Sequence, residues 1–300
     1  MKLTFGDKVF HAVIYVLLTF LGFITLYPFW NSTVISFNSG LDTSLGGITF
    51  WPREFTLDNY KVVFSDRRLL DAFMISILRT VAGTALSVTL TMMLGYGLSR
   101  KGVLFHKYYM LFFLFTMFFQ GGLIPSFLIN RSLGLMDNFL VLVVPFLINV
   151  WNMIIFRTFF RELPEGLEES AKLDGCNQFG ILFRIMVPVS GPVIATLSLF
   201  TAIFHWNDWF TATIYMNNQQ LMPVQSLLQQ ILNSNLASEL LLEATGGNAS
   251  AMDAFDRAQT ISTKSLSMAI MIVTTLPIIM IYPFLQKYFV KGVMVGSLKG

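Results

Sequence analysis

The sequence predicts an all-α membrane protein with six transmembrane helices and a polar cytoplasmic loop between the fourth and fifth helices. Two features of composition point to this class: 54% of the 300 residues are hydrophobic, and only 12% are charged. A soluble domain carries about 25% charged residues, so an ordinary soluble globule is excluded. A third observation is that the apolar residues gather in runs of about 20 or more, the length that a helix needs to cross a bilayer.

Six such runs define the expected spans of a single transmembrane domain that covers residues 1–300. They lie at about residues 10–37, 71–98, 105–128, 136–160, 190–215 and 264–287. The first run is longer than the apolar region of a signal peptide, and no small-residue cleavage site follows it. We therefore expect the first run to be a retained membrane helix.

The distribution of Lys and Arg predicts the orientation of these spans. If the N-terminus is cytoplasmic, most basic residues fall on the cytoplasmic side and lie close to span ends, as the positive-inside rule requires. We therefore expect a multi-pass protein with both termini in the cytoplasm. The basic residues are scattered between apolar runs rather than gathered in one patch, so the net charge of +3 does not indicate a nucleic-acid partner.

Local motifs of catalysis and metal binding are missing from the sequence. No Gly-Lys dipeptide occurs, so a phosphate-binding loop of the G-x-x-x-x-G-K-[ST] type is excluded. The histidines His11, His106 and His205 are too far apart for a local metal motif, and neither H-E-x-x-H nor G-x-S-x-G is present. We therefore expect that the chain is not an enzyme and binds no cofactor or metal itself.

The polar segment 161–189, between the fourth and fifth expected spans, has the pattern of a short helix. Glutamates, including Glu168 and Glu169, lie near its start and Lys172 lies near its end, an order that suits the helix dipole. Gly175 is placed to terminate the helix. Taken by itself, this pattern is also that of an ordinary amphipathic connector.

The spacing within this segment resembles the EAA loop of binding-protein-dependent ABC import permeases. The pattern of that loop is Glu-Ala-Ala, three residues, Gly, nine residues, Ile, any residue and Leu-Pro. The matching positions here are Glu169, Ser170, Ala171, Gly175, Ile185, Val187 and Pro188. Ser170 replaces an alanine and Val187 replaces a leucine, and both replacements are small or apolar. Similarity also extends to GGLIPSFLI at 121–129, to residues 206–208 and to the tail YFVKGVMVGSLKG at 288–300.

This resemblance covers nearly the whole chain and implies the permease subunit of an ATP-driven sugar or oligosaccharide importer in the bacterial cytoplasmic (inner) membrane. It implies as partners a second homologous permease, two ATP-binding subunits that hold ATP and Mg, and an external solute-binding protein that delivers the sugar. Loop 161–189 is then the coupling loop that meets the ATPase. The expected coupling residues are Glu168, Glu169, Ser170, Ala171, Asp174, Gly175, Ile185 and Pro188.

Polar and aromatic residues inside the expected spans are candidates for the solute pathway. The candidates are Ser76 and Thr80 in the second span, Trp151 and Asn152 in the fourth, and His205, Trp206, Asn207 and Asp208 in the fifth. Hydroxyl groups of sugars suit such hydrogen-bonding side chains, and an intramembrane carboxylate is a functional suspect. Two alternatives stay open, namely close helix packing for the second span and an interfacial position for Asp208. Arg79 is expected to extend outward to the interface or to line the pathway.

A second class of function remains open at this point. A secondary transporter would couple solute to protons through Asp208 or His205, and it would work without partner subunits. That hypothesis leaves the EAA-like loop unexplained, and no inverted repeat of the kind common in secondary transporters is visible. A membrane enzyme or receptor is a third possibility, for which no motif argues.

Overall fold

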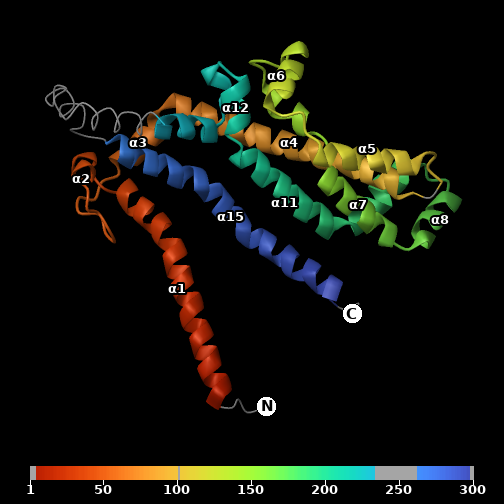
Figure 1. The fold of residues 1–300 in the computed structure, drawn as a ribbon, viewed down its shortest axis with the longest axis horizontal. Coiled ribbons are helices and arrows are strands. Elements are labelled where there is room, and N and C mark those ends of the chain that lie inside the picture. The colour runs from red at the N-terminus through yellow and green to blue at the C-terminus, as the bar shows by residue number, and fades with distance from the viewer. Residues whose placement is uncertain (1–4, 101, 234–261, 298–300) are drawn as a thin grey trace. The chain divides into compact units, whose positions relative to one another are not determined.

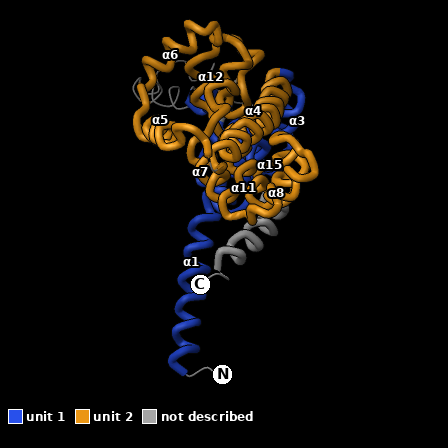
Figure 2. Tube along the Cα trace, turned by 90° about the vertical axis from the view of Figure 1, so that its right-hand side faces the viewer, with its two compact units in different colours: residues 1–67, 228–276 blue, residues 68–227, 277–300 orange. Residues whose placement is uncertain are grey.

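A computed structural model describes residues 5–100, 102–233 and 262–297 of the chain (Figure 1). The predicted all-α class is confirmed, because the described residues form helices and a single isolated bridge between Asn38 and Phe55. Two compact units are distinguished within the chain (Figure 2). Unit 1 comprises residues 1–67 and 228–276, and unit 2 comprises residues 68–227 and 277–300. The single transmembrane domain over residues 1–300 stays a prediction.

Unit 1 contains a long apolar helix, two short helices and the first part of the last helix. These are α1 (Phe5–Ser36), α2 (Gly40–Leu45), α3 (Asp58–Ser65) and α15 (Thr263–Ser297), of which residues 263–276 belong to this unit. A hydrogen bond of 3.0 Å from Ser265 Oγ to Asn59 Oδ1 ties α15 to α3. Asn59 Nδ2 donates in turn to the carbonyl of Ser36, the last residue of α1, and to that of Asn38, so one buried side chain joins three segments.

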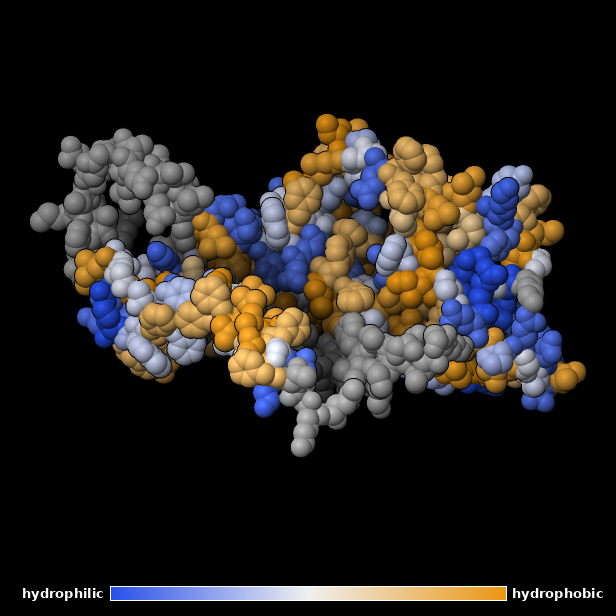
Figure 3. All heavy atoms as spheres, turned by 60° about the horizontal axis from the view of Figure 1, so that its bottom comes forward, coloured by the Kyte–Doolittle hydropathy of each residue, from blue (hydrophilic) through white to orange (hydrophobic). Residues whose placement is uncertain are grey.

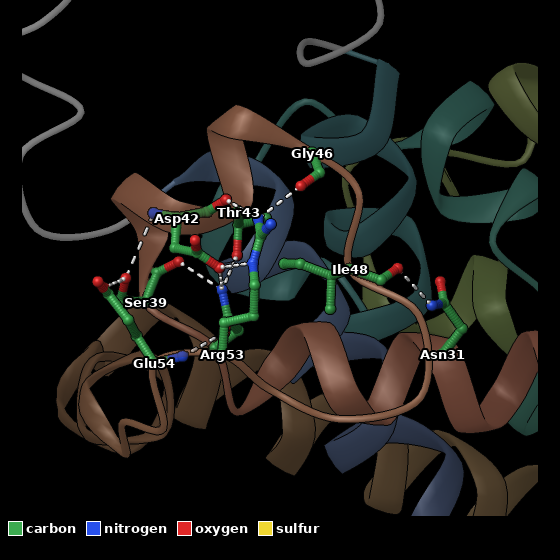
Figure 4. Close-up of polar contacts among 9 residues, drawn as sticks. Asn31, Ser39, Asp42, Thr43, Gly46, Ile48, Arg53 and Glu54 are labelled. Atoms are coloured by element: carbon green, nitrogen blue, oxygen red, sulfur yellow. Dashed lines mark hydrogen bonds and ion pairs between the residues drawn. The ribbon is translucent and has the colours of Figure 1, made fainter.

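The loop that follows α1 is held by a polar network around Asp42 (Figure 4). Asp42 Oδ2 accepts hydrogen bonds from Asn38 Nδ2 at 2.8 Å and from Arg53 Nε at 3.0 Å. Arg53 Nη2 also donates to the carbonyl of Gly46 at 2.6 Å. The hydrogen bond from Asn38, together with the neighbouring Arg53, holds the pKa of Asp42 below its ordinary value.

Unit 2 is built around one continuous helix and a series of shorter ones. The long helix is α4 (Arg67–Ser99), and after it come α5 (His106–Phe118), α6 (Leu123–Ser132), η1 (Phe139–Leu142), η2 (Val144–Phe146) and α7 (Val150–Glu162). The remaining elements are α8 (Glu165–Leu173), α9 (Gln178–Ile181), the π-helical turn η3 (Leu182–Met186), α10 (Val187–Val189), α11 (Gly191–Asn207), α12 (Phe210–Tyr215) and η4 (Gln219–Leu221).

Three described helices are long and apolar enough to cross a membrane, and the number rises to six if each of three bent pairs forms one span. The continuous helices are Phe5–Ser36, Arg67–Ser99 and Lys264–Ile281. The bent pairs are His106–Phe118 with Leu123–Ser132, Phe139–Phe146 with Val150–Glu162, and Gln178–Val189 with Gly191–Asn207, with bends of 114°, 46° and 87°. The three continuous helices and three bent pairs are consistent with six spans, and the number of spans stays a prediction.

The expected spans at 105–128, 136–160 and 190–215 each contain a break in the helix, and each break has a local cause. Gly122 takes a φ of +85° between α5 and α6, a conformation that favours glycine. The side chain of Asn149 accepts a hydrogen bond from the backbone of Asn152 and so starts α7 as a new helix. Asp208 ends α11, and its carboxylate caps α12.

A hydrophobic core joins α4, α7, α8, α9 and α11 within unit 2. Tyr96, Phe156, Phe160, Ala171 and Ile181 are among its buried members. Helices α4 and α7 cross closely there, because a Cβ atom on Gly95 would lie only 2.8 Å from Phe156 Cβ. The same core therefore anchors the polar loop that contains α8.

Candidate functional site

A short helix is present where the sequence predicts one, and its end has a defined geometry. The amide of Cys176 donates to the carbonyl of Ala171 and the amide of Gly175 donates to that of Lys172, each at 3.0 Å. This pair of bonds is a Schellman motif, with Asp174 as the C-cap and Gly175 at φ +78°. Glycine is suited to this position because a side chain disfavours the left-handed conformation.

The two faces of α8 differ in what they contact. Ala171 is buried in the core, and Ile185, further along the loop, packs against the same cluster. Glu168 is buried as well and forms ion pairs with Arg100 and with Lys172, the latter at 2.9 Å. The other candidate residues of the loop, Glu169, Ser170, Asp174, Gly175 and Pro188, are exposed. Hydrophilic residues gather in Figure 3 at the end of unit 2 where α8 lies in Figure 1.

A second feature is a pocket of about 190 Å³ among α4, α7, α11 and the turn before α7. Its polar lining consists of Ser87, Asn149, Asn152, Thr201 and His205. Aromatic and apolar walls are supplied by Pro145, Phe146, Ile148, Phe200 and Phe204. The pocket therefore combines neutral hydrogen-bonding groups with aromatic faces.

His205 lies on α11 at the wall of this pocket, and only 1% of its surface is accessible to solvent. Neither ring nitrogen has a hydrogen-bond partner among the described residues. The ring rests on Gly83 of α4, where a Cβ atom would lie 2.5 Å from Nε2. Nearby, Asn152 Nδ2 donates to Thr201 Oγ1 at 3.3 Å. Buried polar groups are stable when they find partners, so the imidazole suits water or a ligand hydroxyl in the pocket.

The structure brings only two of the expected pathway residues, Asn152 and His205, into this pocket. Thr80 and Trp206 line a different pocket of about 430 Å³, whose other walls are apolar side chains. Trp151 is 62% exposed and Asn207 is exposed, outside either pocket. These four residues therefore lie outside the pocket of Asn152 and His205, and their contact with a solute stays a prediction.

Ser76 and Asp208 are engaged in contacts within the chain. Ser76 Oγ accepts a 2.9 Å hydrogen bond from the amide of Val224, which ties α4 to the segment after η4. The Asp208 carboxylate accepts from the amides of Phe210 at 3.1 Å and Thr211 at 3.2 Å, and so caps α12.

Arg79 completes the environment of Asp208. It forms an ion pair with the carboxylate, and its Nη1 donates to the Asp208 carbonyl at 2.6 Å. The arginine side chain is fully buried, so an outward extension to the interface is wrong. The two residues are 129 positions apart, and no local pattern in the sequence pairs them.

Asn149 and Gly83 are site residues to which sequence reasoning gave no role in this pocket. Asn149 had a local signal, since an isolated amide within an apolar run before Asn152 is a typical N-cap. Gly83 had none, because its role depends on the approach of His205 from a distant helix.

Long apolar helices, a polar pocket among α4, α7 and α11 and an exposed short helix in a polar loop are together the features of a subunit for transport across a membrane. Residues 73–295 match the family described as "Binding-protein-dependent transport system inner membrane component". The chain belongs to this family.

Individual proteins similar to the chain extend the comparison over nearly its full length. The polygalacturonan/rhamnogalacturonan transport system permease protein YtcP of Bacillus subtilis (strain 168) is 38% identical, over 98% of this chain and 99% of that protein. Protein LplC of the same organism is 38% identical, over 99% of this chain and 97% of its own length. A solved structure of a bacterial ABC transporter involved in the import of the acidic polysaccharide alginate contains a chain with a TM-score of 0.85 and 28% identity. That likeness covers 96% of this chain and 99% of the solved chain.

Proposed function

We propose that this permease subunit translocates an oligosaccharide in an ATP-driven importer, and that an external solute-binding protein delivers the sugar. The observation that carries the proposal is the full-length similarity to a permease named for polygalacturonan and rhamnogalacturonan transport. The likeness to a chain of an alginate importer supports the same class of cargo. By this proposal the chain lies in the bacterial cytoplasmic membrane with both termini in the cytoplasm.

The pocket around His205 is the proposed contact for the sugar. Asn152, Thr201 and His205 offer neutral donors and acceptors, and Phe146 and Phe204 offer ring faces. Sugar hydroxyls hydrogen-bond to the first kind of group, and the apolar face of a pyranose ring packs on the second. Neutral groups also permit release, since no fixed ion pair to the cargo has to be broken.

The exposed face of α8 is the proposed contact for an ATP-binding subunit. Glu169, Ser170 and Asp174 are free to meet a partner there, whereas Ala171 fixes the opposite face in the core. Gly175 sets the direction in which the chain leaves the helix. ATP and Mg are then held by two such partner subunits, and a second homologous permease completes the translocation path.

The geometry of Asp208 disfavours this residue as the proton carrier of the secondary-transporter alternative. Its carboxylate is committed to Arg79 and to the backbone of α12, which is the pattern of a structural cap and ion pair. A proton carrier has to exchange its proton with the pathway, and the described pocket around His205 does not include Asp208.

Two pairs of variants test the proposal in a reconstituted complex with its partner subunits. Glu169→Lys reverses a charge on the exposed face of α8, and Glu162→Lys makes the same change at the end of α7. We expect the first to weaken co-purification of the ATP-binding subunit and the second to leave it intact. His205→Phe should lower sugar uptake while ATPase activity persists, with Thr196→Val on the same helix as its control. Equal behaviour of variant and control in both pairs would refute the proposed sites.

A further inference from the structure

The cytoplasmic end of α4 carries an ion pair to α8 that the proposed coupling contact does not use. Arg100, the residue after α4, pairs through Nη1 with Oε2 of Glu168. The other oxygen of Glu168 accepts from Lys172. The side chains of Arg100 and Glu168 are only 21% and 10% exposed, so water screens this pair far less than a surface ion pair.

Arg100 is held in place by its surroundings as well as by Glu168. Its Cζ lies 4.2 Å from the ring centroid of Tyr96, one turn earlier in α4, in a cation–π arrangement. The Tyr96 hydroxyl in turn donates to Gln178 Oε1 of α9 at 3.1 Å. The guanidinium is therefore fixed relative to α4, and Glu168 fixes α8 to the guanidinium.

The same end of α4 is packed against α7 with little freedom to slide. Arg157 Nε donates to the carbonyl of Leu98 at 3.1 Å. Gly95 approaches Phe156 so closely that a Cβ atom would lie 2.8 Å from Phe156 Cβ. Packed interfaces of this kind move as bodies rather than deform continuously.

Further along, α4 reaches the groups that form the polar pocket. Ser87 lines the pocket, Gly83 supports His205, and Arg79 holds Asp208 at the break between α11 and α12. From Arg79 to Ser99, the residue before Arg100, an unbroken helix extends about 30 Å at 1.5 Å per residue. A displacement applied at one end of this helix therefore also moves its other end.

We propose that Arg100 is a positioning residue that joins α8 to α4, so that a displacement of α8 by the ATP-binding partner moves the wall of the polar pocket. This inference rests on the proposed function. Arg100 acts through Glu168 and α4 and touches neither sugar nor nucleotide. Glu168 is a charged residue of α8 that turns inward, whereas its neighbour Glu169 is exposed to the partner.

The first test compares transport with ATP hydrolysis in proteoliposomes that hold the complete complex. We expect Arg100→Gln and Glu168→Gln to lower the amount of sugar moved per ATP by about tenfold, within the usual range of coupling between sites. The exchange Arg100→Glu with Glu168→Arg should restore most of that ratio. Arg161→Gln serves as control. Arg161 and Arg100 both line a cavity of about 290 Å³ beside α8, which is distinct from the polar pocket around His205. We expect this variant to leave the amount of sugar moved per ATP unchanged.

The ratio of sugar moved to ATP hydrolysed separates a positioning role of Arg100 from a merely structural one, since poor folding lowers transport and hydrolysis together. A normal ratio in both single variants would overturn the proposal. Wild-type complex that hydrolyses no ATP would instead count against the proposed function.

A cross-link gives an independent test that does not depend on the stability of the charge variants. Cysteines replace Arg100 and Glu168 in a Cys176→Ser background, which removes the chain's single native cysteine. If a short bifunctional thiol reagent joins the two introduced cysteines, the cross-link itself shows that α8 lies beside the end of α4. The double-cysteine complex lacks the ion pair, so we expect it to move little sugar per ATP before reaction and to regain most of that ratio when cross-linked, because the reagent then joins the two helices. A ratio that is normal before cross-linking, or that does not rise after it, would overturn the proposal.

Discussion

Replacement of Asp208 by asparagine separates the two roles that this residue has been given. Asparagine keeps an oxygen for the amides of Phe210 and Thr211, so the cap of α12 is retained. The change removes only the negative charge opposite Arg79. A structural ion pair therefore predicts a loss of stability, whereas a proton carrier predicts a loss of transport in fully folded protein.

The expected magnitude follows from the burial of the pair. Arg79 is 0% exposed and Asp208 is 11% exposed, so the variant leaves a cation without a counter-charge away from water. Removal of one partner from a buried pair costs about 3–5 kcal/mol. We expect about 3 kcal/mol here, because the Asp208 carbonyl still accepts from Arg79 Nη1. Arg79→Met combined with Asp208→Asn should recover most of this loss, since the uncompensated charge is then removed.

The assay is a double-mutant cycle on the free energy of unfolding in mixed detergent micelles, with uptake measured on the same preparations. Uptake per folded molecule should be near wild type in the double variant. A single variant that unfolds like wild type, or a stable double variant without ATP-driven uptake, would contradict the structural role of the pair.

Three further predictions follow from local geometry. Gly175→Ala should cost about 1 kcal/mol of stability through its left-handed backbone alone, as no atom crowds the added Cβ, and thermal unfolding measures the cost. Gly95→Ala should destabilise the contact with Phe156 by about 1–3 kcal/mol, whereas Gly97→Ala on the same helix meets no neighbour and should be harmless in the same assay. The pKa of Asp42 is lowered in the folded loop, so its stabilising effect is present above the unfolded pKa of about 4 and is lost as the pH falls through the folded value. Pepsin cleavage within residues 37–57 should therefore increase on acidification, and this dependence should flatten in Asp42→Asn.

Local signals explain why α8 was predictable from the sequence. Charge order and a terminal glycine both act within about ten residues, and the Schellman motif at Gly175 confirms the termination that they indicate. The family resemblance drawn from the same loop is confirmed over residues 73–295. Long apolar stretches were equally visible, because hydropathy sums over a whole span.

Breaks within spans and contacts between spans were not predictable in the same way. Hydropathy does not register a cap such as Asn149 or a left-handed glycine such as Gly122, because each leaves the average unchanged. The pairing of Arg79 with Asp208 depends on how α4 meets α11, and Gly83 beneath His205 depends on the same crossing. Tertiary geometry fixes these contacts, and the sequence near each residue carries no record of its partner.

The most direct test of the central claim is uptake of labelled oligosaccharide into proteoliposomes that contain the purified complex. The account predicts uptake that requires ATP, the solute-binding protein and an ATP-binding subunit bound to this chain. Sugar uptake by the chain alone, driven by a proton gradient without ATP, would contradict it.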